Sequence, residues 1–378
     1  MGTLCLCMIV RDEAATIETC LASAREHIDT WVICDTGSTD GTQDVIRAAL
    51  DGVPGELHER PWVDFGHNRS ELMALARGRA DHLLLLDADW ELEVQPGALD
   101  ALTADAYMVR HAGGIEFHNK RIVSGALDWR YVGAAHEYIT SGAERTCERL
   151  AGVKIHVRSI GGERRGRWQR DAELLAAELE REPGDARAAF YLAQTWRDMA
   201  GVADDDDLRR RALEQYLRRA EMPGWDEETH CALKEAGDLH AALGDWPAAQ
   251  DAYLRAWELR PERLEPLHAL SVGLRSRDRP LAAHRFAAVA AGGVTLPVPD
   301  DDLFVAPWIY AWGMLFEYSI TSWWAGDFDA TLAACDRLAA MPGLPDAVRL
   351  QNRRNRLLAV QRRVAHLAEP VLRGTEAV

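Results

Sequence analysis

Two aspartates, Asp87 and Asp89, stand two residues apart directly after the run Leu83-Leu84-Leu85-Leu86. Four consecutive leucines predict a strand buried in a sheet, which places both carboxylates at the edge of an apolar core. This placement costs folding free energy unless something compensates, and a bound divalent cation would do so because it prefers oxygen ligands. The alternative is an acidic loop in which Asp89 caps a helix. The pair therefore predicts a metal site if other polar residues join it.

A second polar motif follows the apolar segment Trp31–Cys34. It begins at Asp35 and continues as the turn Thr36-Gly37-Ser38-Thr39-Asp40-Gly41, which leads into a helix. Ser, Thr and Asp are typical caps at a helix start. The short side chain of Asp35 could accept a hydrogen bond from the imide N–H of a nucleobase. The turn needs no ligand to form, so a structural role stays open.

A third motif, Asp64-Phe65-Gly66-His67-Asn68-Arg69, leads into an amphipathic helix. An arginine beside a glycine turn at a helix start can reach a base or a diphosphate. An ordinary surface arginine is the alternative for Arg69.

Short apolar runs and amphipathic stretches alternate up to about residue 165 and would position these motifs. This order predicts a parallel sheet that is buried on both faces. In such sheets ligands bind beyond the carboxyl ends of the strands. The predicted strands are Leu4–Val10, Trp31–Cys34, Leu57–Glu59, His82–Leu86, Tyr107–Arg110 and Val153–Val157, and the predicted helices are Glu13–Glu26, Thr42–Leu50 and His67–Arg77.

In their order along the chain, these motifs resemble those of the family 2 glycosyltransferases of the GT-A fold. The resemblance covers roughly residues 3–160 and includes the first strand with its Asp12-Glu13 pair. The two aspartate motifs are its specific part. Thr36 departs from many relatives, which carry Asn, Gly or Asp there, without an evident loss of chemistry. The resemblance implies an α/β, GT-A (Rossmann-like) catalytic domain over residues 1–165.

The resemblance also implies how a nucleotide-sugar would be bound. Val10 and Glu13 would line the nucleotide pocket, and Asp35 would read the base. Arg69 would touch the base or the diphosphate, and Asp87 would contact the ribose or the metal.

The remaining implied roles concern the metal and the catalytic base. Asp89 would hold Mn²⁺ or Mg²⁺, and His156 matches a position where relatives place a histidine near the metal. A carboxylate in the aromatic-rich segment 128–138 would deprotonate the acceptor, with Glu137 favoured over Asp128. His136 could support the metal or be structural.

After residue 165 the composition changes to Ala, Leu, Arg and Glu with helical spacing. A 34-residue unit that starts at His230 carries small and bulky residues where a tetratricopeptide repeat needs them. Its turn Gly244-Asp245 has an echo at Gly326-Asp327. The acidic run Asp204–Asp207 is predicted to be a solvated loop. Residues 166–378 are therefore expected to form an all-α helical solenoid.

The bulk composition excludes some functions. The formal net charge of −17 argues against a nucleic-acid binder, because little offsets phosphate repulsion. No apolar segment is long enough to span a membrane, and the N-terminus lacks the basic start of a signal peptide. A cytoplasmic location is expected.

Together the motifs and the resemblance imply a metal-dependent glycosyltransferase that uses a nucleotide-sugar, with UDP-sugars favoured. Inversion of the anomeric configuration is what the resemblance to family 2 implies. The repeats would present a groove to a peptide or protein acceptor, as in bacterial enzymes that glycosylate peptides. A carbohydrate or natural-product acceptor is an alternative, and the repeats could instead pair two copies of the chain. A non-catalytic tetratricopeptide scaffold would be expected to lack Asp89.

Overall fold

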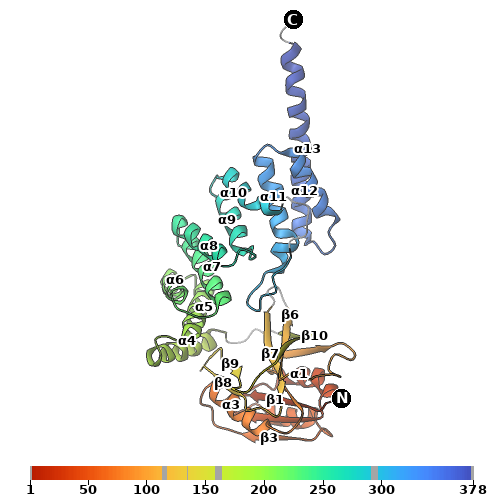
Figure 1. The fold of residues 1–378 in the computed structure, drawn as a ribbon, viewed down its shortest axis with the longest axis vertical. Helices are drawn as coiled ribbons and strands as arrows, with labels where there is room; N and C mark the ends of the chain where they lie inside the picture. The colour runs from red at the N-terminus through yellow and green to blue at the C-terminus, as the bar shows by residue number, and fades with distance from the viewer. Residues whose placement is uncertain (1, 113–116, 134, 158–163, 291–296, 376–378) are drawn as a thin grey trace. The chain divides into compact units, whose positions relative to one another are not determined.

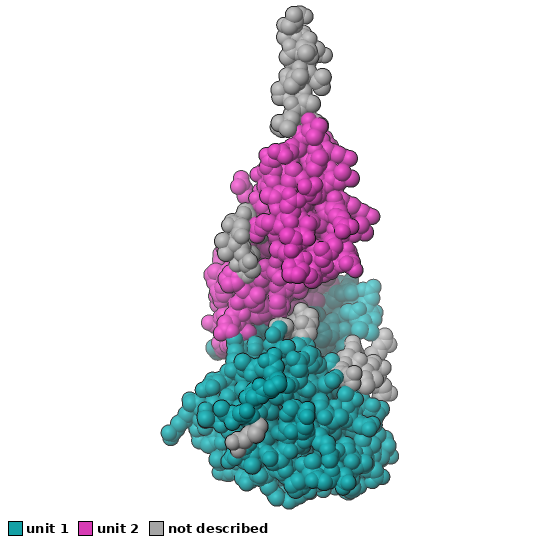
Figure 2. Space-filling view, turned by 90° about the vertical axis from the view of Figure 1, so that its right-hand side faces the viewer, with its two compact units in different colours: residues 1–223, 302–304 teal, residues 224–301, 305–378 magenta. Residues whose placement is uncertain are grey.

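The computed structural model describes residues 2–112, 117–133, 135–157, 164–290 and 297–375. Strands alternate with helices up to Leu85, further strands follow up to Val157, and helices follow from Arg164. This order confirms the predicted α/β part followed by a helical solenoid (Figure 1). Two compact units divide the chain differently. Unit 1 comprises residues 1–223 and 302–304, and unit 2 comprises residues 224–301 and 305–378 (Figure 2). The domain limits 1–165 and 166–378 stay predictions.

Eight strands of the described chain form one sheet in unit 1, in the order β3-β2-β1-β4-β7-β6-β10-β5. The strands β1 to β4 are mutually parallel. Antiparallel pairing of β7 and β5 with their neighbours corrects the expectation of a purely parallel sheet. The strands are β1 (Leu4–Val10), β2 (Thr30–Asp35), β3 (Gly55–Glu59), β4 (His82–Leu85), β5 (Trp90–Val94), β6 (Ala106–Ala112), β7 (Phe117–Ser124) and β10 (Cys147–Val157).

The central strand β1 serves two apolar layers because its side chains alternate between the faces of the sheet. Leu6 and Met8 belong to one core with residues of α1 (Ile17–Ala24) and α2 (Thr42–Ala49). Cys5 and Cys7 belong to another core with residues of α3 (Phe65–Ala76). The helices thus cover both faces, and the carboxyl ends of the parallel strands are left for a site.

The helical part begins in unit 1 with α4 (Arg164–Arg181), α5 (Ala186–Ala203) and α6 (Asp206–Ala220). The acidic run is a helix start and not only a loop, because Asp205 caps α6 by accepting from the backbone N–H groups of Asp207 and Leu208. Acidic residues there are also favoured by the helix dipole.

In unit 2 the predicted repeat is the helix pair α7 (Asp226–Ala242) and α8 (Trp246–Leu259). Asp245 caps α8 by accepting from the backbone N–H of Ala248 at 3.2 Å. The predicted echo is real, since Asp327 caps α12 in the same way at 2.9 Å. The other helices are α9 (Glu265–Arg275), α10 (Pro280–Ala287), α11 (Met314–Trp324), α12 (Phe328–Ala340) and α13 (Asp346–Thr375). Within the described ranges, no helix is both long enough and apolar enough to cross a membrane.

Candidate active site

A pocket in unit 1 collects most of the predicted site residues. It opens where β1, β2 and β4 end, since Val10 pairs with Asp35 across β1 and β2, and Cys7 pairs with Leu85 across β1 and β4. The lining residues are Ile9, Val10, Arg11, Glu13, Thr36, Trp62, Phe65, Arg69, Asp87, Ala88, Asp89 and Arg170. The parallel register therefore brings together motifs that lie up to about 80 residues apart in the sequence.

The turn after β2 is built around the carboxylate of Asp35. Its Oδ1 accepts from the backbone N–H groups of Gly37 at 2.7 Å and Ser38 at 2.8 Å. Gly37 has a φ of 108°, in the left-handed region that favours glycine. The Oδ2 of Asp35 is buried and has no hydrogen-bond partner among the described residues. A buried, unpaired carboxylate oxygen is costly and invites a ligand donor.

The segments that follow β1 and β2 are joined to each other by hydrogen bonds. The backbone N–H of Glu13 donates to the hydroxyl of Thr42 at 2.8 Å, and that of Ala14 donates to Asp40 at 2.9 Å. Hydrogen bonds, first of all from Thr42, lower the pKa of Asp40. This network holds Glu13 at the pocket wall before any ligand arrives.

Arg69 joins two carboxylates. This buried side chain on α3 lies 2.5 Å from Asp87 and 2.7 Å from Glu137. Burial by itself would lower the pKa of Arg69, but Asp87 and Glu137 outweigh it and raise that pKa. Arg69, predicted to touch a base or diphosphate, is thus engaged with the acids of the site itself.

Glu137 lies between two short strands, β8 (Arg130–Val132) and β9 (Tyr138–Thr140). Its side chain is 11% exposed. Burial raises the pKa of Glu137, and this effect exceeds the opposing one of Arg69. A raised carboxyl pKa beside a pocket is typical of a group that exchanges protons.

Helix α5 contacts the residues on both sides of Glu137. The guanidinium of Arg187 donates to the carbonyl of His136 at 2.9 Å, and it lies over the rings of Tyr138 and Tyr191. The imidazole of His136 stacks on Tyr191 with ring centroids 4.3 Å apart. We call these contacts the α5 clamp, namely Arg187 and Tyr191 on residues 136–138. His136 therefore contacts α5.

Four predicted site residues are absent from the pocket lining: Asp35 and Glu137, which adjoin the lining residues Thr36 and Arg69, and also Asp128 and His156. Asp128 is 80% exposed, pairs with Arg77 at 3.4 Å and does not line the pocket. His156 contacts Glu93 at 2.7 Å on neighbouring strands, and it is likewise absent from the pocket wall. Their roles as base and metal ligand stay predictions.

Sequence reasoning did not select a second cation, Arg121 of β7. Burial lowers the pKa of Arg121, whose charged neighbours include Asp87 and Glu137. Its guanidinium lies 4.3 Å from the ring centroid of Trp90. Tyr131, beside Arg69, has a pKa that burial raises to about 12, so it stays neutral. Trp129 is 3% exposed and packs in the core.

Comparison with known proteins agrees with the motifs. The family model described as Glycosyl transferase family 2 matches residues 5–109. A TPR repeat-containing protein of Synechococcus elongatus is 29% identical over 276 residues, which are 66% of this chain and 66% of the relative. The chain thus spans just under two thirds of that relative's length.

Solved structures show weaker similarity. S. aureus TarS has 11% identity and a TM-score of 0.38, over 66% of this chain and 55% of that one. A tetratricopeptide repeat protein from Parabacteroides merdae has 16% identity and a TM-score of 0.38, over 56% of this chain and 75% of that one. Both TM-scores are too low to support a conclusion. The family match is the informative comparison, and it shows that residues 5–109 are similar to family 2 glycosyltransferase domains.

Proposed function

We propose that this chain is an inverting glycosyltransferase that transfers a sugar from a nucleotide-diphosphate donor. The family match supports a nucleotide-sugar donor, and inversion follows from the resemblance to family 2 enzymes. One observation carries the proposal. A single pocket beyond parallel strands has Asp89 and Arg69 in its wall, and Arg69 pairs with Asp87 and Glu137. Acids and a cation gathered at such an edge suit chemistry on a diphosphate sugar.

The donor base would lie against the turn that begins at Asp35. The Oδ2 of Asp35, which has no partner among the described residues, can accept the imide N–H of uracil or of thymine, and of these two we favour a UDP-sugar. Trp62 and Phe65 supply an aromatic wall, with ring centroids 4.8 Å apart. Val10 and Glu13 would complete this side of the nucleotide pocket.

Asp89 is the residue that we propose to hold a divalent cation, Mn²⁺ or Mg²⁺. Asp89 lines the pocket beyond the end of β4, and its neighbour Asp87 pairs with Arg69. In the described ranges, no group of three or more His, Cys, Asp or Glu side chains is arranged to hold a metal. Mg²⁺, however, often takes one or two protein carboxylates together with substrate phosphates, so the donor set fits an ion bound with the nucleotide. When bound, such an ion would act as a Lewis acid on the diphosphate.

Glu137 is the proposed catalytic base. It would take the proton of the acceptor nucleophile as that nucleophile bonds to the anomeric carbon. The bond from the anomeric carbon to the diphosphate oxygen breaks in the same step, and its electron pair leaves with the nucleoside diphosphate. Arg69 would keep Glu137 oriented toward the acceptor.

The acceptor is proposed to be a peptide or protein side chain. The support is the helical solenoid, because stacked helix pairs form extended concave surfaces that suit extended chains. A carbohydrate or natural-product acceptor would need only the pocket.

A thermal-shift panel of UDP-, GDP- and dTDP-sugars with Mn²⁺ or Mg²⁺ tests the proposal. A donor at 100 times its Kd should stabilise the protein by about 2.7 kcal/mol, and UDP-sugars should give the largest shift. Asp89→Ala should abolish the metal-dependent part of the shift and turnover, whereas Asp128→Ala should keep the shift. Stabilisation by no donor, or full activity in EDTA, would exclude the proposed mechanism.

A further inference from the structure

Arg170 lines the same pocket as Asp89 and Arg69, although it belongs to α4. This helix opens the helical part of the chain, yet it lies in unit 1 with the sheet. The side chain of Arg170 is exposed at the pocket wall.

Among the residues that the structure describes, three arginines line the pocket, and they differ in their partners. Arg69 is committed to two carboxylates. Arg11 lies 3.9 Å from its neighbour Asp12. Arg170 makes no hydrogen bond and no ion pair with any residue that the structure describes. Arg170 is therefore available to an anionic ligand.

The charge of the pocket calls for such a cation. Glu13, Asp87 and Asp89 line it, and Glu137 adds a fourth carboxylate beside Arg69. These carboxylates repel a diphosphate that enters the pocket. One metal ion, together with an Arg69 that already pairs with two carboxylates, would offset this repulsion only in part. A guanidinium suits this task, because it binds phosphate oxygens through two parallel N–H groups.

We propose that Arg170 binds the diphosphate of the donor and stabilises the charge that develops on the leaving nucleoside diphosphate. The first helix of the helical part would then complete the donor site, rather than serving only acceptors. This inference rests on the proposed function.

Calorimetric titration of the full chain tests the inference with Mn²⁺ present. The probes are UDP, GDP and dTDP, and then the monophosphate of the one that the wild-type protein binds most tightly. Arg170→Ala should weaken diphosphate binding roughly 10- to 100-fold and leave monophosphate binding nearly unchanged. Arg170→Lys should recover part of the loss. Arg181→Ala is the matched control, since it removes an exposed arginine from the last turn of the same helix.

The outcomes separate the two proposals. If the wild-type protein binds none of the three nucleoside diphosphates, the proposed function fails. If it binds one and Arg170→Ala binds it equally well, only the role of Arg170 fails. An equal loss for diphosphate and monophosphate, or an equal loss in Arg181→Ala, also overturns that role.

Discussion

The buried Arg69 balances the charge of two carboxylates, Glu137 with its side chain 11% exposed and Asp87 with its side chain 28% exposed. Removing one member of a buried ion pair leaves the others uncompensated, which typically costs about 3–5 kcal/mol. Arg69→Met should therefore lower the free energy of unfolding of unit 1 by roughly that amount. Hydrogen exchange of the backbone amides in β1 and β4, recorded as denaturant is added, measures this loss of unfolding free energy.

Arg77→Met is the control, because the Arg77–Asp128 pair has side chains 51% and 80% exposed. Exposed pairs contribute less than about 1 kcal/mol. Equal losses in the two variants would show that the contacts of Arg69 with Asp87 and Glu137 add nothing to stability.

Glu137 and Asp128 can be told apart by the pH dependence of transfer. A general base works only when deprotonated, so the rate falls as the pH drops through the pKa of the base. Because burial raises the pKa of Glu137, the acid limb should lie above the ordinary glutamate value of about 4.3. Glu137→Gln should lower kcat by roughly 10²- to 10⁴-fold with donor affinity retained.

Asp128→Asn should change neither kcat nor the pH at which the rate falls on the acid side. A normal rate in Glu137→Gln, or a donor affinity that falls as much as kcat, would remove Glu137 from the role of base.

Residue types alone were enough to locate Asp35, Asp87 and Asp89 at the strand ends, because a carboxylate after an apolar run is a strong local signal. The place of Arg121 near the site could not be predicted, since it lies within a strand whose neighbours in the sheet are set by the fold. The partners of Arg69 are equally nonlocal. Its bond to Glu137 joins residues far apart in the sequence, and no local pattern encodes that contact.

At the scale of elements, the α5 clamp links the helical part to the proposed base. Arg187→Ala would free residues 136–138 and misplace Glu137 with little change in the donor pocket. We expect kcat to fall roughly 10- to 100-fold while the KM for donor stays near the wild-type value, because small misplacements of a catalytic group are expensive. Hydrogen exchange at residues 136–138 should rise in parallel.

Arg218→Ala is the matched control. Arg218 of α6 also donates to a backbone carbonyl, that of Pro183 at 2.8 Å, but Pro183 lies outside residues 136–138. A fall in kcat without faster exchange at residues 136–138 would mean that Arg187 acts in some other way.

The elements that could be predicted are those with a strong period or a cap. The turns at Gly244-Asp245 and Gly326-Asp327 identified paired helices because each joins a left-handed glycine to a capping aspartate. The strands β5 and β7 were missed. Their charged residues, including Glu91, Glu93, Lys120 and Arg121, hide the apolar pattern, and their antiparallel pairing is set by partners distant in sequence.

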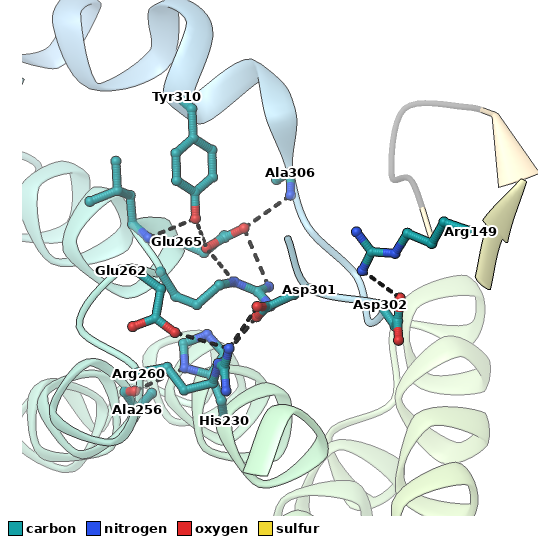
Figure 3. Close-up of polar contacts among 12 residues, drawn as sticks. Arg149, His230, Ala256, Arg260, Glu262, Glu265, Asp301, Asp302, Ala306 and Tyr310 are labelled. Atoms are coloured by element: carbon teal, nitrogen blue, oxygen red, sulfur yellow. Dashed lines mark hydrogen bonds and ion pairs between the residues drawn. The ribbon is translucent and has the colours of Figure 1, made fainter. Parts of the chain in front are cut away.

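At the scale of the whole molecule, the chain changes units within a few residues. Residues 302–304 belong to unit 1, whereas Asp301 and Val305 belong to unit 2. Inside unit 2, Asp301 accepts from Arg260 at 2.6 Å and from Arg263 at 2.9 Å (Figure 3). Inside unit 1, Asp302 pairs with Arg149 at 2.7 Å. Two adjacent aspartates thus serve different units.

Their burial predicts that substitution will affect the units unequally. Asp301 and Arg263 are 7% and 1% exposed, while the side chains of Asp302 and Arg149 are each about a third exposed. Asp301→Asn removes one of the two carboxylate charges that Arg263 pairs with in the printed network, the other being Glu265, and we expect unit 2 to lose about 3 kcal/mol. Asp302→Asn should cost unit 1 less than about 1 kcal/mol.

Hydrogen exchange resolved by element is the suitable measurement, because a chain of two units need not unfold in one step. Asp301→Asn should speed exchange in α9 and leave β6 and β10 protected, since Glu265 of α9 shares Arg263 with Asp301. Asp302→Asn should leave α9 unchanged. Equal loss of protection in both units after Asp301→Asn would mean that the units unfold together, and unchanged protection of α9 would show that the buried network contributes no stability.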